Sequence, residues 1–174
     1  SKGVQFIDSE KMFSENDFPG DELFVDHVHF TFTGSYFLAR LFADQVVSTL
    51  KLEGSRKDWL SEEDCAKRLG LTPIHRIQIL REMQQWFSKA PFRDQPNYQE
   101  RDSKIVSEIA RLNSIQSPQN LDEEEKNFES LLIDNSNDWQ LRKEFAMHLA
   151  VRKKYNESSI QYQRMAEIMP HRPE

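Results

Sequence analysis

The sequence has few glycines, a single cysteine and no long apolar run. Five glycines in 174 residues, without alternating apolar runs beyond the first 30 residues, disfavour a β-rich fold. The lone cysteine, Cys65, excludes an intrachain disulfide framework and is expected to pack as a small apolar residue on a helix. Because no run of 18 apolar residues is present, the sequence predicts no membrane-spanning helix.

An excess of basic residues is also lacking. The chain holds 23 lysines and arginines against 29 aspartates and glutamates, a formal net charge of -6. The chain therefore lacks the excess of basic residues that is typical of a nucleic-acid-binding surface. The first 50 residues contain 8 of the 12 phenylalanines and 8 acidic side chains against 3 basic ones. Such aromatic density in an acidic segment indicates packing against something larger, or else a local core.

Helical periodicity dominates from Tyr36 onward and predicts a mainly α fold. We expect a helical bundle of helix hairpins behind a short extended or β segment near the N-terminus. Three regions are predicted, with bounds 1–55, 56–95 and 96–174. Within the first, Leu23–Val25 is predicted to form a short buried strand, Gly34 a tight turn, and Tyr36–Leu52 a helix capped by Ser35.

The segment Asp26-His27-Val28-His29 joins the predicted strand to the turn, and it carries the residues most suited to chemistry. A carboxylate three residues before a histidine can hold the imidazole by its Nδ1 proton. The Nε2 atom then faces a substrate-side hydroxyl. Asp26 and His29 are therefore the candidate catalytic residues, Asp26 as the orienting acid and His29 as the general base.

These residues carry a family resemblance. The pattern D-x-x-H, a glycine five positions past the histidine, an aromatic residue and a run ending in Leu-Ala spans Asp26 to Ala39. It resembles the last motif block of SGNH/GDSL esterases and acyltransferases, over about the first 50 residues. By that likeness Asp26 orients His29, and His29 activates a serine. The family's G-D-S serine block and its oxyanion-hole blocks do not occur in this sequence; Ile7-Asp8-Ser9 imitates the first faintly, without its glycine.

Two other interpretations of the same segment stay open. In one, Asp26 and the two histidines only terminate a strand and cap a turn. In the other, His27 and His29 share one face of an extended segment and bind a metal, with Asp21 or Asp44 as the third ligand. The sequence otherwise indicates no cofactor.

The middle of the chain predicts paired helices. Ser61 with the acids after it is typical of a helix start, Gly70 ends that helix, and Thr72-Pro73 opens the next. The stripe that should face the core of this second helix is Ile74, Ile77, Leu80, Met83, Trp86 and Phe87. The pair resembles a helix-turn-helix, with His75, Arg76, Gln78 and Arg81 on the second helix, and a plain helical hairpin is the alternative. Ala90–Asn97 is expected to be an extended connector.

The last third resembles a tetratricopeptide repeat from Trp139 to Pro170, with a turn near Lys154-Tyr155. Its inner positions are Phe145, Ala146 and Leu149, with Tyr162 on the second helix. A period of 34 residues places a degenerate copy upstream, from Ile105–Leu112 to Leu131–Ile133. Fewer than three repeats need a neighbour. We therefore expect a protein partner, the rest of a parent chain or a second copy of this chain.

These patterns favour the C-terminal part of an SGNH-type esterase or acyltransferase, inactive alone, that carries a helical module for protein interaction. The alternative is a stand-alone helical interaction domain with no catalytic role, and a third interpretation is a helix-turn-helix DNA-binding protein. His75, His148 and His171 have no acidic residue at an obvious spacing, so the sequence assigns them no chemistry.

Overall fold

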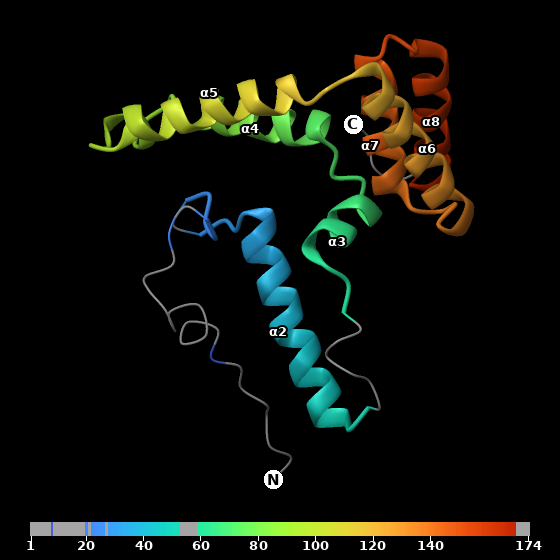
Figure 1. The fold of residues 1–174 in the computed structure, drawn as a ribbon, viewed down its shortest axis with the longest axis horizontal. Coiled ribbons are helices and arrows are strands. Elements are labelled where there is room, and N and C mark those ends of the chain that lie inside the picture. Colours follow the sequence, from blue (N-terminus) through green and yellow to red (C-terminus); the bar gives the residue numbers. More distant parts are fainter. Residues whose placement is uncertain (1–7, 9–19, 21, 27, 53–58, 170–174) are drawn as a thin grey trace. The chain divides into compact units, whose positions relative to one another are not determined.

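The computed structural model describes residues 8, 20, 22–26, 28–52 and 59–169, and these residues confirm a mainly α fold (Figure 1). They contain seven α-helices, one short 3-10 helix and one isolated β-bridge. The chain divides into two compact units, Ser1–Glu63 and Asp64–Glu174. Each unit has its own internal contacts and is considered by itself.

The first unit contains a tight reversal of the chain just before its helix. Phe24 and Phe30 form an isolated antiparallel bridge, and their rings pack with centroids 4.7 Å apart. The amide of Val25 donates to the carbonyl of His29 at 2.8 Å. The predicted strand at Leu23–Val25 is therefore wrong in extent, because the chain turns back within a few residues and leaves room for a single bridge.

Helix α2 runs from Phe32 to Leu50 and starts earlier than the sequence predicts. Thr31, not Ser35, is its N-cap, and the Thr31 side chain accepts from the amide of Gly34. Gly34 thus lies inside the first turn of the helix. A Cβ atom at this position would lie 2.2 Å from the carbonyl oxygen of Leu23. The glycine is needed for close approach of the reversal to the helix, not for a turn of special backbone angles.

Polar side chains along α2 hold the segment that leads into the next helix. Thr33 donates to the carboxylate of Glu62, and Tyr36 donates to the carbonyl of Leu60. About two turns further along α2, Asp44 accepts from the indole of Trp59 at 3.1 Å. These contacts repeat at helical spacing, so one side of α2 is occupied by residues from Trp59 to Glu62.

Helix α3 (Glu62–Arg68) and helix α4 (Pro73–Phe87) are joined by a short turn around Gly70. The amide of Leu71 donates to Ala66 and that of Gly70 to Lys67, which is the Schellman pattern, with Gly70 at φ +70°. The predicted stop at Gly70 is confirmed. The predicted start of α4 is confirmed as well, because Thr72 caps it and Pro73 occupies its first turn.

Helix α4 packs along α5 (Tyr98–Ser114) as a hairpin. The predicted stripe of α4 is confirmed in part: Ile74, Ile77 and Phe87 are buried, Leu80 and Met83 are half-buried, and Trp86 is 49% exposed. The connector is not extended as predicted. It contains a 3-10 turn, η2 (Phe92–Asp94), that contacts both helices and brings the Phe92 ring within 5.4 Å of Phe87.

Helices α6 (Pro118–Asp134), α7 (Trp139–Val151) and α8 (Tyr155–Ile168) form the main core of the second unit. The buried cluster of this core comprises Phe128, Leu141, Phe145 and Leu149. Asp138 caps α7, and Lys153 ends it with a left-handed backbone at φ +61°. The degenerate upstream repeat predicts that the helix holding Ile105–Leu112 pairs with the helix that ends near Leu131–Ile133. In the structure α5 packs along α4 instead, and α6 packs along α7.

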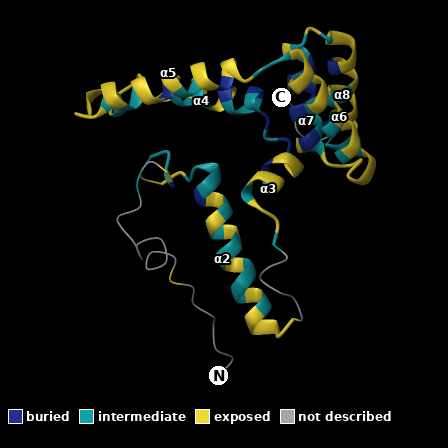
Figure 2. Cartoon of the chain, in the orientation of Figure 1, coloured by how far each residue is buried: buried dark blue, intermediate teal, exposed yellow. Residues whose placement is uncertain are grey.

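Burial differs sharply between the two units (Figure 2). Twelve hydrophobic residues of the described chain are buried, and only Leu23 belongs to the first unit. Helix α2 is apolar, yet its one buried residue is Gly34. The described residues of the first unit therefore contain almost no core of their own.

Candidate functional site

The reversal before α2 brings Asp26 and His29 together as the sequence predicts. The ring Nδ1 of His29 lies 2.8 Å from Oδ2 of Asp26. The Asp26 side chain is 3% exposed and the His29 side chain 56% exposed. A buried carboxylate therefore contacts one edge of an imidazole whose ring reaches solvent.

The second oxygen of Asp26 is held by the backbone. Oδ1 accepts from the amides of Val28 and His29, each at 2.8 Å. This arrangement is an Asx-type turn, in which a side-chain carboxylate organises the two or three residues after it. With both oxygens engaged, the carboxylate is fixed in orientation, and it fixes the imidazole in turn.

The surroundings of Asp26 favour its ionised form. Burial by itself would raise the pKa of the Asp26 carboxyl, but hydrogen bonds from the Val28 amide and from the ring and amide of His29 outweigh it. Together they lower the pKa from 3.8 to about 2. An ionised Asp26 only accepts hydrogen bonds, so the Nδ1 atom of His29 must carry the proton between them.

A frame of backbone and hydroxyl contacts positions this pair. The amide of Thr31 donates to the carbonyl of Leu23 at 2.9 Å, and the Thr31 hydroxyl donates to the carbonyl of Glu22 at 2.8 Å. The close approach of Gly34 to Leu23 holds the same strip of chain against α2. These contacts anchor the reversal to the start of α2.

This arrangement can orient a general base. With Nδ1 protonated toward Asp26, the Nε2 atom on the opposite edge of the ring is the atom able to accept a proton. The chemistry also needs a nucleophile and donors for an oxyanion. Ser9, the faint serine candidate, lies outside the described residues.

The described part of the chain contains no set of ligands for the metal site that the sequence left open. His27 and Asp21 lie outside the described residues. Asp44 accepts a hydrogen bond from Trp59. No group of three or more histidine, cysteine, aspartate or glutamate side chains within the described ranges is placed to hold a metal ion.

Sequence reasoning missed two acid and histidine contacts in the second unit. The Nδ1 atom of His75 on α4 lies 3.0 Å from Oε2 of Glu144 on α7, although the pair is not aligned as a hydrogen bond. The Nδ1 atom of His148 on α7 lies 3.4 Å from Oε2 of Glu124 on α6. The sequence does contain one sign of these contacts. On α7 the polar residues Glu144 and His148 lie at helical spacing on the same face as the apolar residues Leu141 and Phe145.

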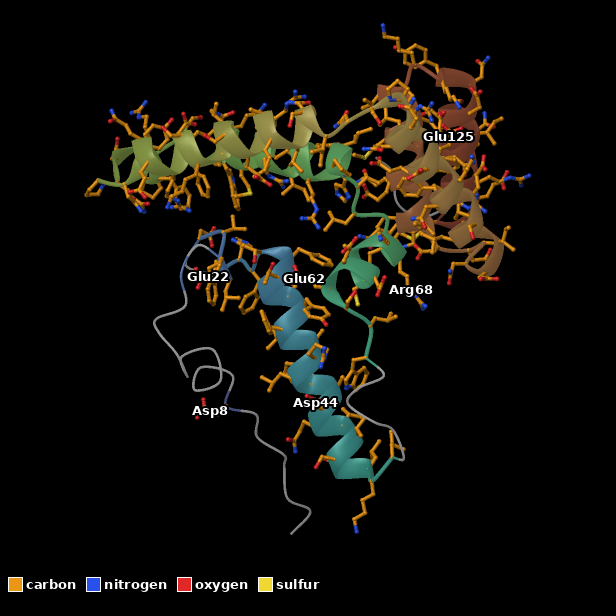
Figure 3. All side chains as sticks on the ribbon, in the orientation of Figure 1. Asp8, Glu22, Asp44, Glu62, Arg68 and Glu125 are labelled. Atoms are coloured by element: carbon orange, nitrogen blue, oxygen red, sulfur yellow. The ribbon has the colours of Figure 1, made fainter. Side chains whose placement is uncertain are left out.

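Charged side chains lie beside the second of these contacts, and Figure 3 labels one of them, Glu125 of α6. Arg152, at the end of α7, pairs with Glu125 and Asp122 of α6 and donates to the carbonyl of Leu121. Lys154 also pairs with Glu125. The ends of α6 and α7 are thus joined by an ion-pair cluster beside a histidine that is 1% exposed.

The predicted DNA-reading surface of α4 is partly occupied by protein contacts. His75 contacts the buried Glu144, and Gln78 donates to Glu82 on its own helix. A recognition helix needs such side chains directed to base edges. His75 is therefore committed to the interior contact of α4 with α7.

Comparison with protein-family models, with curated proteins and with solved structures found no match to this chain. None of the described helices is long and apolar enough to cross a membrane.

Proposed function

We propose that this chain supplies the acid and base of an SGNH-type esterase or acyltransferase, joined to a helical module that binds protein. In this proposal Asp26 orients His29, and His29 accepts the proton of a serine located outside these 174 residues. The chain alone is inactive. The helices that follow Asp64 hold or position a partner.

The observation that carries the proposal is the contact of His29 Nδ1 with a buried, ionised Asp26. A turn that merely ends a strand requires backbone hydrogen bonds to the carboxylate, and Oδ1 alone provides them. The imidazole contact to Oδ2 is additional. It gives the ring the tautomer and the orientation that a general base for a hydroxyl requires.

Exposed apolar residues on α2 support the same proposal. Phe42, Val46 and Leu50 follow one another at helical spacing and are 50%, 50% and 63% exposed, and Phe37 is 51% exposed. Adjacent large apolar side chains on one helix normally face a core or an interface. A helix that follows the D-x-x-H block by this likeness covers a hydrolase sheet, which would bury this surface.

The helical module has its own core, as a binding scaffold requires. Phe128 and Phe145 stack with centroids 5.1 Å apart, and the Ser158 hydroxyl of α8 donates to the carbonyl of Ala146 on α7. Hairpins of this type present the faces that they do not bury to each other or to a partner. The resemblance to a tetratricopeptide repeat favours a protein segment as that partner.

The first test is to determine the coding sequence upstream of Ser1. The coding sequence before Ser1 should encode a G-D-S block, and the longer polypeptide should hydrolyse a short-chain aryl ester. Replacing the base (His29→Ala) should lower kcat/KM by about a hundredfold or more, the usual contribution of a positioned general base. Asp26→Asn should also lower it. The matched control is Val28→Ala, since Val28 lies between the two residues and is 60% exposed.

Two results would overturn the proposal. One is an upstream sequence without a serine block, together with no loss of any esterase activity on replacing His29. The other is turnover by the 174-residue chain alone that His29→Ala abolishes, because the nucleophile would then lie within this chain.

The second candidate is an interaction domain with no catalytic role. It is favoured by exposed apolar side chains at the C-terminal hairpin, where Val151, Tyr155 and Ile160 are 59%, 65% and 53% exposed. Under this function the contact of Asp26 with His29 only stabilises a turn. Replacing His29 would then leave ester hydrolysis by the longer polypeptide unchanged, whereas replacing Tyr155 would weaken capture of its partner.

A further inference from the structure

A partly buried acid and a buried histidine lie close together between α6 and α7. Glu124 Oε2 and His148 Nδ1 are 3.4 Å apart, with side chains 18% and 1% exposed. Neither this oxygen nor either ring nitrogen finds a well-aligned hydrogen-bond partner among the described residues. Buried polar atoms without partners are costly, and the cost rises steeply when they carry charge.

The ionisable groups around this contact come from every element packed against it. Arg152 and Lys154 follow α7, and both pair with Glu125 of α6. Asp122 of α6 also pairs with Arg152. On the other side, Glu144 lies one turn before His148 on α7 and contacts His75 of α4. The Phe128 ring lies 5.5 Å from that of His148, and the Leu121 backbone of α6 is a polar neighbour of the same imidazole.

We propose that Glu124 and His148 form a proton-dependent latch between α6 and α7, closed while Glu124 holds its proton. Arg152 is the cation whose charge acts on Glu124, and it is already engaged by Glu125 and Asp122. A charge on Glu124 therefore has no cation reserved for it. Loss of the Glu124 proton favours opening of α6 toward solvent, where the carboxylate is hydrated.

The direction of the pH dependence follows from the two groups. Burial raises the pKa of Glu124 from 4.5 to about 7, against the effect of Arg152. A raised folded-state pKa gives stability that is complete below 4.5 and is lost as the pH rises through about 7. Burial and the Arg152 charge lower the pKa of His148 below 6.5, against the effect of Glu125. The contribution of His148 is complete above pH 6.5 and is lost on acidification. The latch is therefore most stable between pH 4.5, above which the Glu124 contribution declines, and pH 6.5, below which the His148 contribution declines.

The experiment measures opening of α6 by amide hydrogen exchange on the full chain at pH 6 and pH 8.5, corrected for intrinsic exchange rates. The variants are Glu124→Gln, which stays neutral, and Glu123→Gln, a matched change at the exposed neighbour. The opening constant of the wild type relative to Glu124→Gln should rise about tenfold between the two pH values, as expected for a carboxyl shifted from 4.5 to about 7. Glu123→Gln should retain the wild-type dependence.

A second readout keeps the test decisive if Glu124→Gln folds poorly. Carboxyl carbon NMR on the wild type should show Glu124 titrating near pH 7. Titration near pH 4.5, or an equal pH dependence of opening in the wild type and in Glu124→Gln, would overturn the latch.

Discussion

Replacing Gly70 by alanine should destabilise the helical module by roughly 2 to 5 kcal/mol. Gly70 has φ +70°, a conformation that costs an L-residue about 1 to 2 kcal/mol. An added Cβ would also lie 2.6 Å from the Phe128 ring and 3.2 Å from Leu141. Both neighbours are buried in the core cluster, so relief requires displacing packed side chains, at about 1 to 3 kcal/mol.

Urea unfolding of the full chain, followed by far-ultraviolet circular dichroism, measures this loss. Gly20→Ala is the matched control, because an added Cβ there meets only the flexible end of the Glu22 side chain. In the double variant Gly70→Ala/Phe128→Leu the smaller leucine side chain should relieve part of the clash with the new Cβ. The total loss should therefore be smaller than the sum of the two single losses, which a double-mutant cycle reports as coupling. A neutral Gly70→Ala, or strict additivity in the cycle, would refute the packing argument.

Three further predictions concern the other backbone and charge features. Lys153→Gly should stabilise the module by about 1 kcal/mol in the same urea assay, because Lys153 ends α7 at φ +61°; destabilisation would contradict this. Asp26 should titrate near pH 2 by carboxyl carbon NMR, and its stabilisation of the reversal should be present above pH 3.8 and be lost as the pH falls through about 2. Gly34→Ala should return the Asp26 pKa toward 3.8, since the new Cβ would lie 2.2 Å from the Leu23 carbonyl oxygen; an unchanged titration would rule out this anchoring role.

Features set by neighbouring residues could be predicted from the sequence. The Thr72 cap with Pro73, the stop at Gly70 and the pairing of Asp26 with His29 each depend on residues no more than five positions apart. Their hydrogen bonds close within one turn of backbone. Local spacing therefore carries enough information to place them.

Features set by distant residues could not be predicted. Glu124 and His148 are 24 positions apart, so only the packing of α6 on α7 brings them together. The role of Gly34 likewise depends on a carbonyl eleven residues earlier, which no helix-start pattern indicates. The choice of α4 as the partner of α5 depends on the compact connector around Phe92, whose prolines suggested an extended path.

The most direct test of the central claim is the tautomer of the His29 ring, measured by long-range proton and nitrogen NMR at a pH where the ring is neutral. The Asp26 carboxylate accepts a hydrogen bond from Nδ1 of His29. We therefore expect the ring proton on Nδ1 and an unprotonated Nε2 that is able to act as a base. Asp26→Asn should weaken that preference. A proton on Nε2 with Nδ1 bare in the native chain would contradict the assignment of Asp26 and His29 as an acid and base pair.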